Sequence, residues 1–237
     1  MDGIFRRVEK KYILDSKQYK KINEILKDYV VPDEYGKSTI CNIYFDTDNY
    51  ELISHSITKP FFKEKVRLRS YNTPKKESTV FLEIKRKVDG VVGKRRIAMQ
   101  LSDFEKYIEN TKSVTNSNKQ IKNEIDYYFK KYKLSKKMYI SYKREAFYAR
   151  EDKDFRITFD WNIKAREYNL NLDKGVYGEN ILSPDKYVME IKTLGAIPIW
   201  FVKVLDECEI SPCGFSKYGE AYTQLTLKAN TLNECIV

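Results

Sequence analysis

The chain has 237 residues, 42% of them apolar, 14% aromatic and 33% charged, which is the composition of an ordered globular protein. Its 44 lysines and arginines against 34 aspartates and glutamates give a formal net charge of +10, which favours nucleic acid, an anionic membrane or a phosphorylated small molecule as partner. No lysine- or arginine-rich run of the kind found in nucleic-acid-binding tails occurs, so we expect the positive charge to be part of the fold itself.

A membrane-spanning or secreted protein is not expected. The longest apolar stretch, residues 196–205, contains Pro198 and Lys203 and falls well short of the ~20 residues of a membrane span. Residues 1–12 lack the apolar core of a signal peptide. The four cysteines have neither the spacing of a zinc site nor the density of a disulfide framework, so we expect them to be reduced. With no repeat or linker in the sequence, we predict a single cytoplasmic domain over residues 1–237.

Five segments have the apolar spacing of amphipathic helices. The first, residues 16–30, places one apolar face at Tyr19, Ile22, Leu26 and Tyr29. Ser102 followed by Glu105 has the pattern of a capping box, which predicts the start of a second helix there. Three more helices are expected at residues 121–132, 200–208 and 220–229.

Segments with the period of two of β-strands lie between these helices, and their polar faces are mainly cationic. In residues 155–161, for example, Arg156, Thr158 and Asp160 alternate with aromatic and aliphatic side chains. The alternation is less regular around Arg144, because Ile140 shares its parity. The charged positions on the polar faces are, in chain order, Arg7, Glu9, Lys11, Arg67, Arg69, Glu83, Lys85, Lys87, Lys94, Arg96, Arg144, Arg156, Asp160, Glu190 and Lys192.

Two interpretations of these faces are open. They are either the solvated outer faces of an ordinary antiparallel sheet or the inner wall of a basic tunnel. Solvated faces usually place opposite charges across from each other, because like charges on facing strands destabilise a sheet. Here lysine and arginine outnumber carboxylates. We therefore favour an α+β fold with an antiparallel β-tunnel whose apolar outer faces are covered by helices.

The residue types on these faces suit phosphate chemistry. Arginine presents a planar fork of donors that matches phosphate oxygens, and lysine adds a compact positive charge. A carboxylate on such a wall has the wrong sign for a phosphate ligand. It is best explained by Mg²⁺ or Mn²⁺, which proteins commonly hold with one or two carboxylates and the substrate phosphates. Glu190 and Glu9 are the leading candidates for the metal. The open alternative for Glu190 is a plain ion pair with Lys192 or a neighbouring arginine.

Nine short motifs in order across nearly the whole chain resemble the VTC (polyphosphate polymerase) domain family of the triphosphate tunnel, or CYTH-like, metalloenzymes. They are EKKY at residues 9–12, YFDT at 44–47, RLR at 67–69, LEIKRK at 82–87, KRRI at 94–97, SYKREAF at 141–147, RITFD at 156–160, MEIK at 189–192 and FSKY at 215–218.

This resemblance implies an eight-stranded antiparallel tunnel and an ATP-dependent polyphosphate polymerase. The enzyme would transfer the γ-phosphoryl group of ATP to a growing inorganic polyphosphate chain and release ADP. Glu190 is assigned to the metal, and Lys217 to the reacting phosphates, where Arg144 and Arg156 are also expected to act. The phosphate-binding positions that it implies are Lys11, Arg67, Arg69, Lys85 and Lys94. Arg96 is added because it lies on the same polar strand face as Lys94.

The sequence also departs from the family's hydrolytic relatives. Those open with a Glu-x-Glu-x-Lys strand that binds metals, whereas this chain has Arg7, Glu9 and Lys11 at the corresponding positions. This exchange argues against a two-metal hydrolase. A tripolyphosphatase or nucleoside triphosphatase and a non-catalytic polyphosphate-binding protein remain as alternatives, and an RNA-binding barrel is the least favoured.

Two further groups of residues are given no catalytic role. The single histidine, His55, lies in a polar stretch and is expected at the surface. Asp46 and Asp48 resemble a pair of metal ligands, but Asp-Thr-Asp-Asn is also typical of a turn at the end of a strand, and the turn is favoured.

Overall fold

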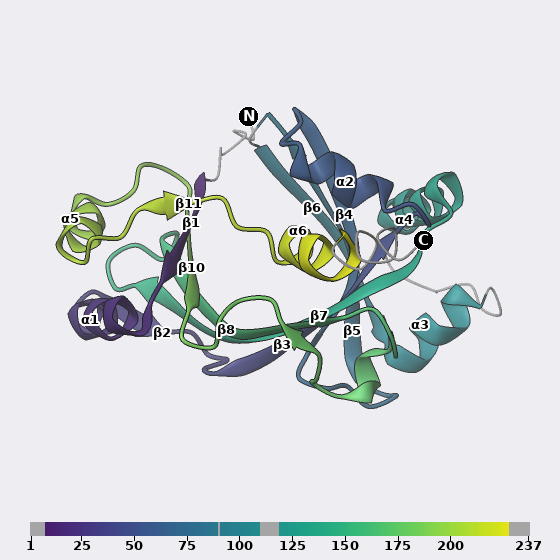
Figure 1. The fold of residues 1–237 in the computed structure, drawn as a ribbon, viewed down its shortest axis with the longest axis horizontal. Coiled ribbons are helices and arrows are strands. Elements are labelled where there is room, and N and C mark those ends of the chain that lie inside the picture. The colour runs from purple at the N-terminus through teal and green to yellow at the C-terminus, as the bar shows by residue number, and fades with distance from the viewer. Residues whose placement is uncertain (1–7, 90, 110–118, 228–237) are drawn as a thin grey trace, which may run out of the picture. The chain divides into compact units, whose positions relative to one another are not determined.

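The computed structural model describes residues 8–89, 91–109 and 119–227, which form two compact units (Figure 1). The first unit comprises the segments up to Ser38, Tyr142–Ile163 and Leu182–Ser216. The second comprises Thr39–Ser141, Lys164–Ile181 and the part from Lys217 on. Strands β7 (Ser135–Ala149) and β8 (Arg156–Arg166) are long enough to contribute residues to both.

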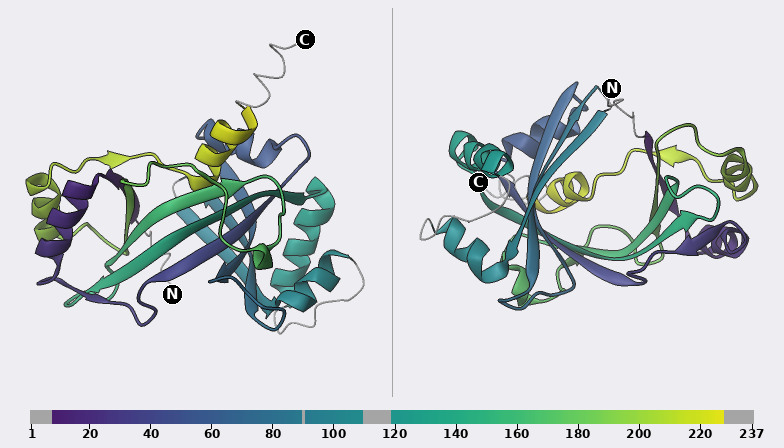
Figure 2. Two further views of the ribbon diagram at one scale, coloured as in Figure 1. Left: turned by 60° about the horizontal axis from the view of Figure 1, so that its bottom comes forward. Right: turned by 180° about the vertical axis from the view of Figure 1, so that it is seen from behind.

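The first unit contains an antiparallel sheet with the strand order β11-β1-β10-β8-β7, and β2 pairs with β7. Its further strands are β1 (Val8–Leu14), β2 (Val30–Pro32), β10 (Tyr187–Thr193) and β11 (Pro212–Cys213). Helices α1 (Ser16–Leu26) and α5 (Ile199–Glu207) lie side by side in Figures 1 and 2 and pack on the apolar face of this sheet.

The core of the first unit follows from the alternation in its strands. Apolar side chains of β1, β8 and β10 point to the same face and pack against Ile22, Leu26, Phe201 and Val204 of the two helices. Because successive strand residues point to opposite faces, the polar residues between them lie together on the other face. Burial of this apolar face, at ~25 cal/mol per Å², is the main force that holds α1 and α5 in place.

The second unit contains the strand order β7-β3-β4-β5-β6, and β9 pairs with β8. Its further strands are β3 (Ser38–Asp46), β4 (Phe62–Tyr71), β5 (Thr79–Val88), β6 (Val91–Gln100) and β9 (Glu179–Asn180). Its helices are α2 (Glu51–Ile57), α3 (Leu101–Ile108), α4 (Lys119–Tyr132), the 3₁₀ turn η1 (Leu172–Lys174), α6 (Lys217–Ala221) and the π-helix η2 (Tyr222–Leu227).

Helices α3 and α4 cover one face of β4, β5 and β6, and α6 lies on the opposite side, as Figures 1 and 2 show. The covered face is apolar, with Val66, Leu68, Leu82, Ile84 and Ile97 fully or nearly fully buried. Alternation therefore places the residues between these apolar ones on the face away from α3 and α4. Three charged residues, Glu64, Arg86 and Arg95, lie instead on the face towards α4, where they contact Tyr128 or Glu124 of that helix.

The strand count differs from the expected eight. The described residues contain eleven strands, of which eight have seven or more residues, and β2, β9 and β11 are pieces of two or three residues. The eight long strands are the antiparallel framework that the sequence predicted. The short ones arise where a loop pairs with a longer strand over two or three residues, which is too short a stretch for any periodicity to reveal.

The four principal helix predictions are confirmed with small shifts of their ends, but the capping box was assigned to the wrong helix. Helix α3 begins at Leu101 with Gln100 as its N-cap, so Ser102 lies inside the helix and does not cap it. A capping box is present at α1 instead, where Asp15 accepts from the N–H groups of Lys17 and Gln18, and Gln18 accepts from the N–H of Asp15. The fifth prediction, residues 220–229, corresponds to the end of α6 and η2 and extends beyond the described residues.

None of the helices in the described part of the chain has the length and apolar composition that crossing a bilayer requires. Cys41, Cys208 and Cys213 are free thiols, as expected, and Cys235 lies outside the described residues.

Candidate functional site

The charged face of β4, β5 and β6 in the second unit is strongly basic. On these strands it presents eight cations and one carboxylate, Glu83. We call this set of cations the basic face; its members are Lys63, Lys65, Arg67, Arg69, Lys85, Lys87, Lys94 and Arg96. It contains all five predicted phosphate-binding residues of the second unit.

Glu83 is the centre of an ion-pair cluster on the basic face. Its carboxylate is 1% exposed and lies 2.8 Å from Nη2 of Arg67 and 2.6 Å from Nζ of Lys94, and it accepts a hydrogen bond from Nε of Arg67. Burial alone would raise the pKa of Glu83, but the charges of Arg67, Arg69 and Lys94 outweigh it and lower that pKa to about 2. Glu83 therefore stays ionised and fixes the positions of Arg67 and Lys94, two of the residues that are predicted to bind phosphate.

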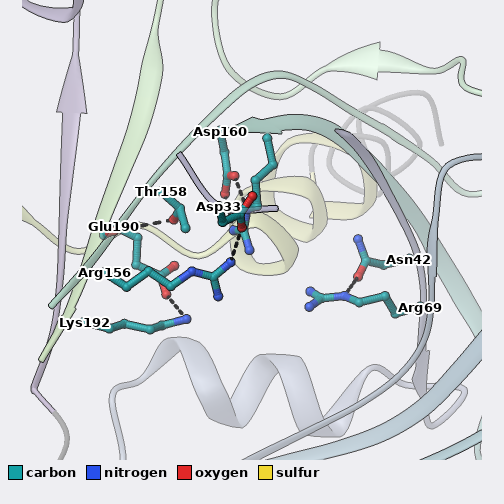
Figure 3. A network of polar contacts seen from close by, with 9 residues as sticks. Asp33, Asn42, Arg69, Arg156, Thr158, Asp160, Glu190 and Lys192 are labelled. Carbon is teal, nitrogen blue, oxygen red and sulfur yellow. Dashed lines mark hydrogen bonds and ion pairs between the residues drawn. The ribbon is translucent and has the colours of Figure 1, made fainter. Parts of the chain in front are cut away.

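Arg69 is oriented by a neutral partner. Its Nε donates to Oδ1 of Asn42 at 3.0 Å (Figure 3). Nδ2 of Asn42 in turn donates to the carbonyl of Ile140 at 3.1 Å. Asn42 is fully buried and Arg69 is 8% exposed. Because one edge of the planar guanidinium is held by the neutral amide of Asn42, its orientation is set, which suits bidentate recognition of phosphate.

A chain of aromatic and polar contacts links Arg67 to the helix that carries Lys217. Nη1 of Arg67 donates to the hydroxyl of Tyr44 at 3.3 Å, and the ring of Tyr44 stacks on Tyr218 with centroids 4.5 Å apart. The Tyr218 hydroxyl in turn donates to Oδ2 of Asp46 at 3.0 Å. Lys217, the first residue of α6, is thereby carried by a helix that docks on β3 in the same unit as the basic face.

The polar face of the first unit has a different charge balance. Within the described part of this unit, four cations lie there with four carboxylates, and each of these cations is within ion-pair distance of one of them. We call this the paired face; it consists of Glu9, Lys11, Asp33, Arg144, Arg156, Asp160, Glu190 and Lys192. Figure 3 shows the contacts around Arg156, Glu190 and Lys192.

Arg144 and Arg156 are held differently within the paired face. Arg144 makes a bidentate pair with the buried Asp160, at 2.6 and 2.7 Å, and this carboxylate raises the pKa of Arg144 well above its usual value in spite of burial. Nη2 of Arg156 contacts Asp33 at 3.0 Å, and its guanidinium lies over the ring of Tyr148. The buried Nε of Arg156 has no hydrogen-bond partner within the described ranges, so this donor suits an incoming anion.

The two predicted metal ligands lie on adjacent strands of the paired face. In the register of β1 and β10, Glu9 is opposite Lys192 and Lys11 is opposite Glu190. Glu190 is 2.7 Å from Nζ of Lys192, so the ion pair considered as its alternative role is present. Lys11 lies 3.9 Å from Glu9 and donates to the carbonyl of Phe215 at 3.0 Å.

The two carboxylates Glu9 and Glu190 suit a metal ion that takes most of its ligands from phosphate. No group of three or more His, Cys, Asp or Glu side chains suited to a metal occurs among residues 8–89, 91–109 and 119–227. One or two carboxylates with phosphate oxygens are the usual protein environment of Mg²⁺, and Glu190 with Glu9 can supply them.

The structure distributes the predicted site residues over the two units. Glu9, Lys11, Arg144, Arg156 and Glu190 lie on the paired face, whereas Arg67, Arg69, Lys85, Lys94, Arg96 and Lys217 belong to the second unit. Sequence reasoning missed the residues that orient them, chiefly Asn42, Tyr44, Glu83, Asp160 and Tyr218. Their roles depend on strand register and on helix docking, and the sequence carried no signal for either beyond the parity of Glu83 and Asp160.

The residues given no catalytic role are accounted for by local structure. His55 is an exposed residue of α2, and its Nε2 lies 3.1 Å from the carbonyl of Phe62. Asp46 accepts from the N–H groups of Thr47, Leu52 and Ile53 at the start of α2. Asp48 pairs with Lys137. This agrees with the predicted structural role of the two aspartates at the end of the strand.

Solved structures support the fold. A candidate adenylate cyclase from Bacillus halodurans is similar over 89% of this chain and 95% of its own, with a TM-score of 0.54 and 13% identity. A protein from Hippeastrum, described as having a dominant triphosphatase activity, is similar over 92% of this chain and 95% of its own, with a TM-score of 0.50 and 13% identity. Together with the antiparallel sheet and its outer helices, these likenesses confirm the triphosphate tunnel fold.

A sequence comparison with curated proteins gave no match. The profile of the VTC domain matches residues 6–226, which is nearly the whole chain and includes every residue of the basic and paired faces. The chain therefore belongs to the VTC domain family.

Proposed function

We propose that this protein is an ATP-dependent polyphosphate polymerase. The observation that carries the proposal is the basic face, where eight cations accompany a single carboxylate on three adjacent strands. So dense an array of like charge suits a ligand with a high density of negative charge. Membership of the VTC domain family, together with the triphosphate tunnel fold, supports a triphosphate or polyphosphate as that ligand.

Positioning and charge neutralisation are the tasks of the protein in such a reaction. The bond between the γ-phosphorus of ATP and the β–γ bridging oxygen breaks, and a terminal oxygen of the acceptor polyphosphate forms the new bond, so that ADP leaves. Arg67 and Arg69 are held by Glu83 and Asn42 in fixed orientations, which lets them bind phosphate oxygens without reorganising. Lys217, Arg144 and Arg156 are assigned to the charge that develops on the transferring group.

Glu190, with Glu9 as a second ligand, would hold Mn²⁺ or Mg²⁺, which neutralises phosphate charge when bound. The ammonium of Lys192 now occupies one oxygen of Glu190 at 2.7 Å. Lys192 therefore has to move aside or share the carboxylate when a cation binds. Since ATP is the phosphoryl donor in this proposal, a cytoplasmic location is part of it.

Binding is the first test. Tripolyphosphate titrated calorimetrically at low ionic strength should bind, and Arg69→Ala should weaken it by roughly 1.5–3 kcal/mol, as for hydrogen bonds to charged groups. Arg95→Ala is the matched control, because Arg95 lies on β6 of the same sheet but its side chain faces Glu124 of α4. Absence of binding, or equal losses in the two variants, would refute the assignment of the basic face.

The product separates the polymerase from its two alternatives. Purified protein incubated with ATP and Mn²⁺ or Mg²⁺ should give phosphate chains longer than three units on a gel that resolves polyphosphate. Release of orthophosphate alone would indicate a triphosphatase, and unchanged ATP with intact tripolyphosphate binding would indicate a binding protein. Glu190→Gln should abolish turnover and preserve phosphate binding, whereas equal activity would return Glu190 to a purely structural pair with Lys192.

A further inference from the structure

The strand face that carries the basic face becomes uncharged at one end. Strand alternation places five uncharged residues on this face at the end marked by Arg69. We call them the neutral end; they are Tyr71 on β4, Thr79 and Phe81 on β5, and Ala98 and Gln100 on β6. These side chains offer no charge to a phosphate chain. The part of a ligand that lies here should therefore be something other than phosphate.

Two aromatic rings and a guanidinium lie together at the neutral end. Tyr71 is 47% exposed and packs edge-on against Phe81, with ring centroids 5.9 Å apart and an angle of 83° between the planes. The guanidinium of Arg96 lies over the ring of Phe81, with Cζ 4.9 Å from the centroid. Exposed aromatic rings and planar guanidinium groups are the surfaces on which nucleobases stack. The neutral end thus offers a platform for a flat heterocycle.

The order of residues along β4 matches the order of groups in a nucleoside triphosphate. Arg67 is linked through Tyr44 and Tyr218 to the helix that begins with Lys217, the residue assigned to the reacting phosphates. Arg69 lies two residues further along β4 and Tyr71 two more, each step being ~7 Å at ~3.4 Å per residue. With the γ-phosphate at Arg67 and Lys217, the α-phosphate extends towards Arg69. The nucleoside then falls on the neutral end.

We infer that Tyr71, Phe81 and Arg96 form the subsite for the nucleobase of the phosphoryl donor. This inference rests on the proposed function and deepens it, because the basic face alone does not distinguish a nucleoside triphosphate from bare tripolyphosphate. A stacking platform at its end makes that distinction. Stacking uses the π face that every base has, so the subsite selects a nucleotide over a phosphate chain without selecting one base over another.

The contact between Tyr71 and Phe81 also has a structural role, since an edge-to-face ring pair on neighbouring strands stabilises a sheet. The two roles predict different behaviour when Tyr71 is truncated. Loss of a purely structural contact affects every ligand of the basic face alike. Loss of a base platform affects only ligands that carry a base.

The test compares two ligands that differ in the nucleoside. Tripolyphosphate and adenosine β,γ-imidotriphosphate, whose γ-phosphate is not transferred, are titrated calorimetrically against wild type, Tyr71→Ala and Tyr71→Phe. Tyr71→Ala should lose roughly 5- to 100-fold in affinity for the adenosine analogue, the range for removal of one aromatic partner of a stacked base. Its affinity for tripolyphosphate should stay unchanged. Tyr71→Phe keeps the ring and should bind both ligands as wild type does.

Tyr127→Ala is the matched control, because Tyr127 is a 58% exposed tyrosine of α4, the helix that covers the other face of the same strands. Equal losses for both ligands in Tyr71→Ala, or an unchanged affinity for the adenosine analogue, would overturn the inference. So would a wild type that binds tripolyphosphate but not the analogue. If tripolyphosphate itself does not bind the wild type, the proposed function fails. That outcome is distinct from failure of the base subsite alone, in which tripolyphosphate binds normally.

Discussion

Replacing Glu83 with glutamine should reveal how strongly the basic face depends on its one carboxylate. The pKa of Glu83 falls from 4.5 to about 2, because Arg67, Arg69 and Lys94 together outweigh the effect of its burial. A difference of ~2.5 pKa units at ~1.4 kcal/mol each amounts to about 3.5 kcal/mol of stability at neutral pH. Glu83→Gln keeps the shape of the side chain and removes this contribution, so its free energy of unfolding should drop by about that amount.

The direction of this pKa shift determines how the stability of the protein depends on pH. Because the pKa is lower in the folded state, the stabilisation is fully present above the unfolded value of ~4.5 and is lost as the pH falls towards ~2. Urea unfolding between pH 7 and pH 2.5 should show this loss in wild type, and Glu83→Gln should lack that component. The control Glu105→Gln removes an exposed pair with Lys76 and should change stability by less than ~1 kcal/mol. Identical pH profiles for Glu83→Gln and wild type would refute the reasoning.

Two other substitutions test the remaining contacts. Lys192→Gln removes the ammonium 2.7 Å from Glu190, so Mn²⁺ in the presence of tripolyphosphate should bind severalfold more tightly by calorimetry; unchanged affinity would separate Glu190 from the metal. Arg166→Lys keeps the charge but loses the planar group that lies 3.5 Å from the ring of Tyr139 and donates to carbonyls of residues 168–177. It should cost about 2–4 kcal/mol and expose residues 167–181 to limited proteolysis, and resistance equal to wild type would contradict this role.

Alternation in β4 and β5 was enough to predict which face Arg67 and Arg69 occupy. In β4 and β5 the apolar residues Val66, Leu68 and Leu82 enter the core, so Arg67 and Arg69 had to lie on the other side. What could not be predicted was the register. Glu83 gains its two cationic partners only because β5 pairs with β4 so that Arg67 stands opposite it, and with β6 so that Lys94 lies two positions along. A period of two carries no information about which residues meet across strands.

Helix α2 shows a second limit of sequence reasoning. Residues 51–57 are too few for an apolar period to stand out, and the helix follows Tyr50 in a left-handed conformation with φ of 56°. Its first N–H groups are satisfied by Asp46, which belongs to the preceding strand and also accepts from Tyr218. Asp46 lies 6 residues from Leu52, to which it is hydrogen-bonded, and 172 residues from Tyr218. A short helix that depends on such contacts cannot be recognised from a local sequence pattern.

The two faces differ in how they would respond to a phosphate ligand. On the paired face each cation already has a carboxylate within ion-pair distance, so an incoming phosphate must compete with Glu9, Asp33, Asp160 or Glu190 for it. This competition lowers the affinity of the paired face for phosphate. The orientation of its cations is nevertheless well defined, because Arg144 is held by two short contacts with Asp160. On the basic face the three strands present a single carboxylate, Glu83, among eight cations, so the salt-dependent part of polyphosphate binding should arise there. Affinity and orientation are thus assigned to different sets of residues, and substitutions in each set should alter one quantity more than the other.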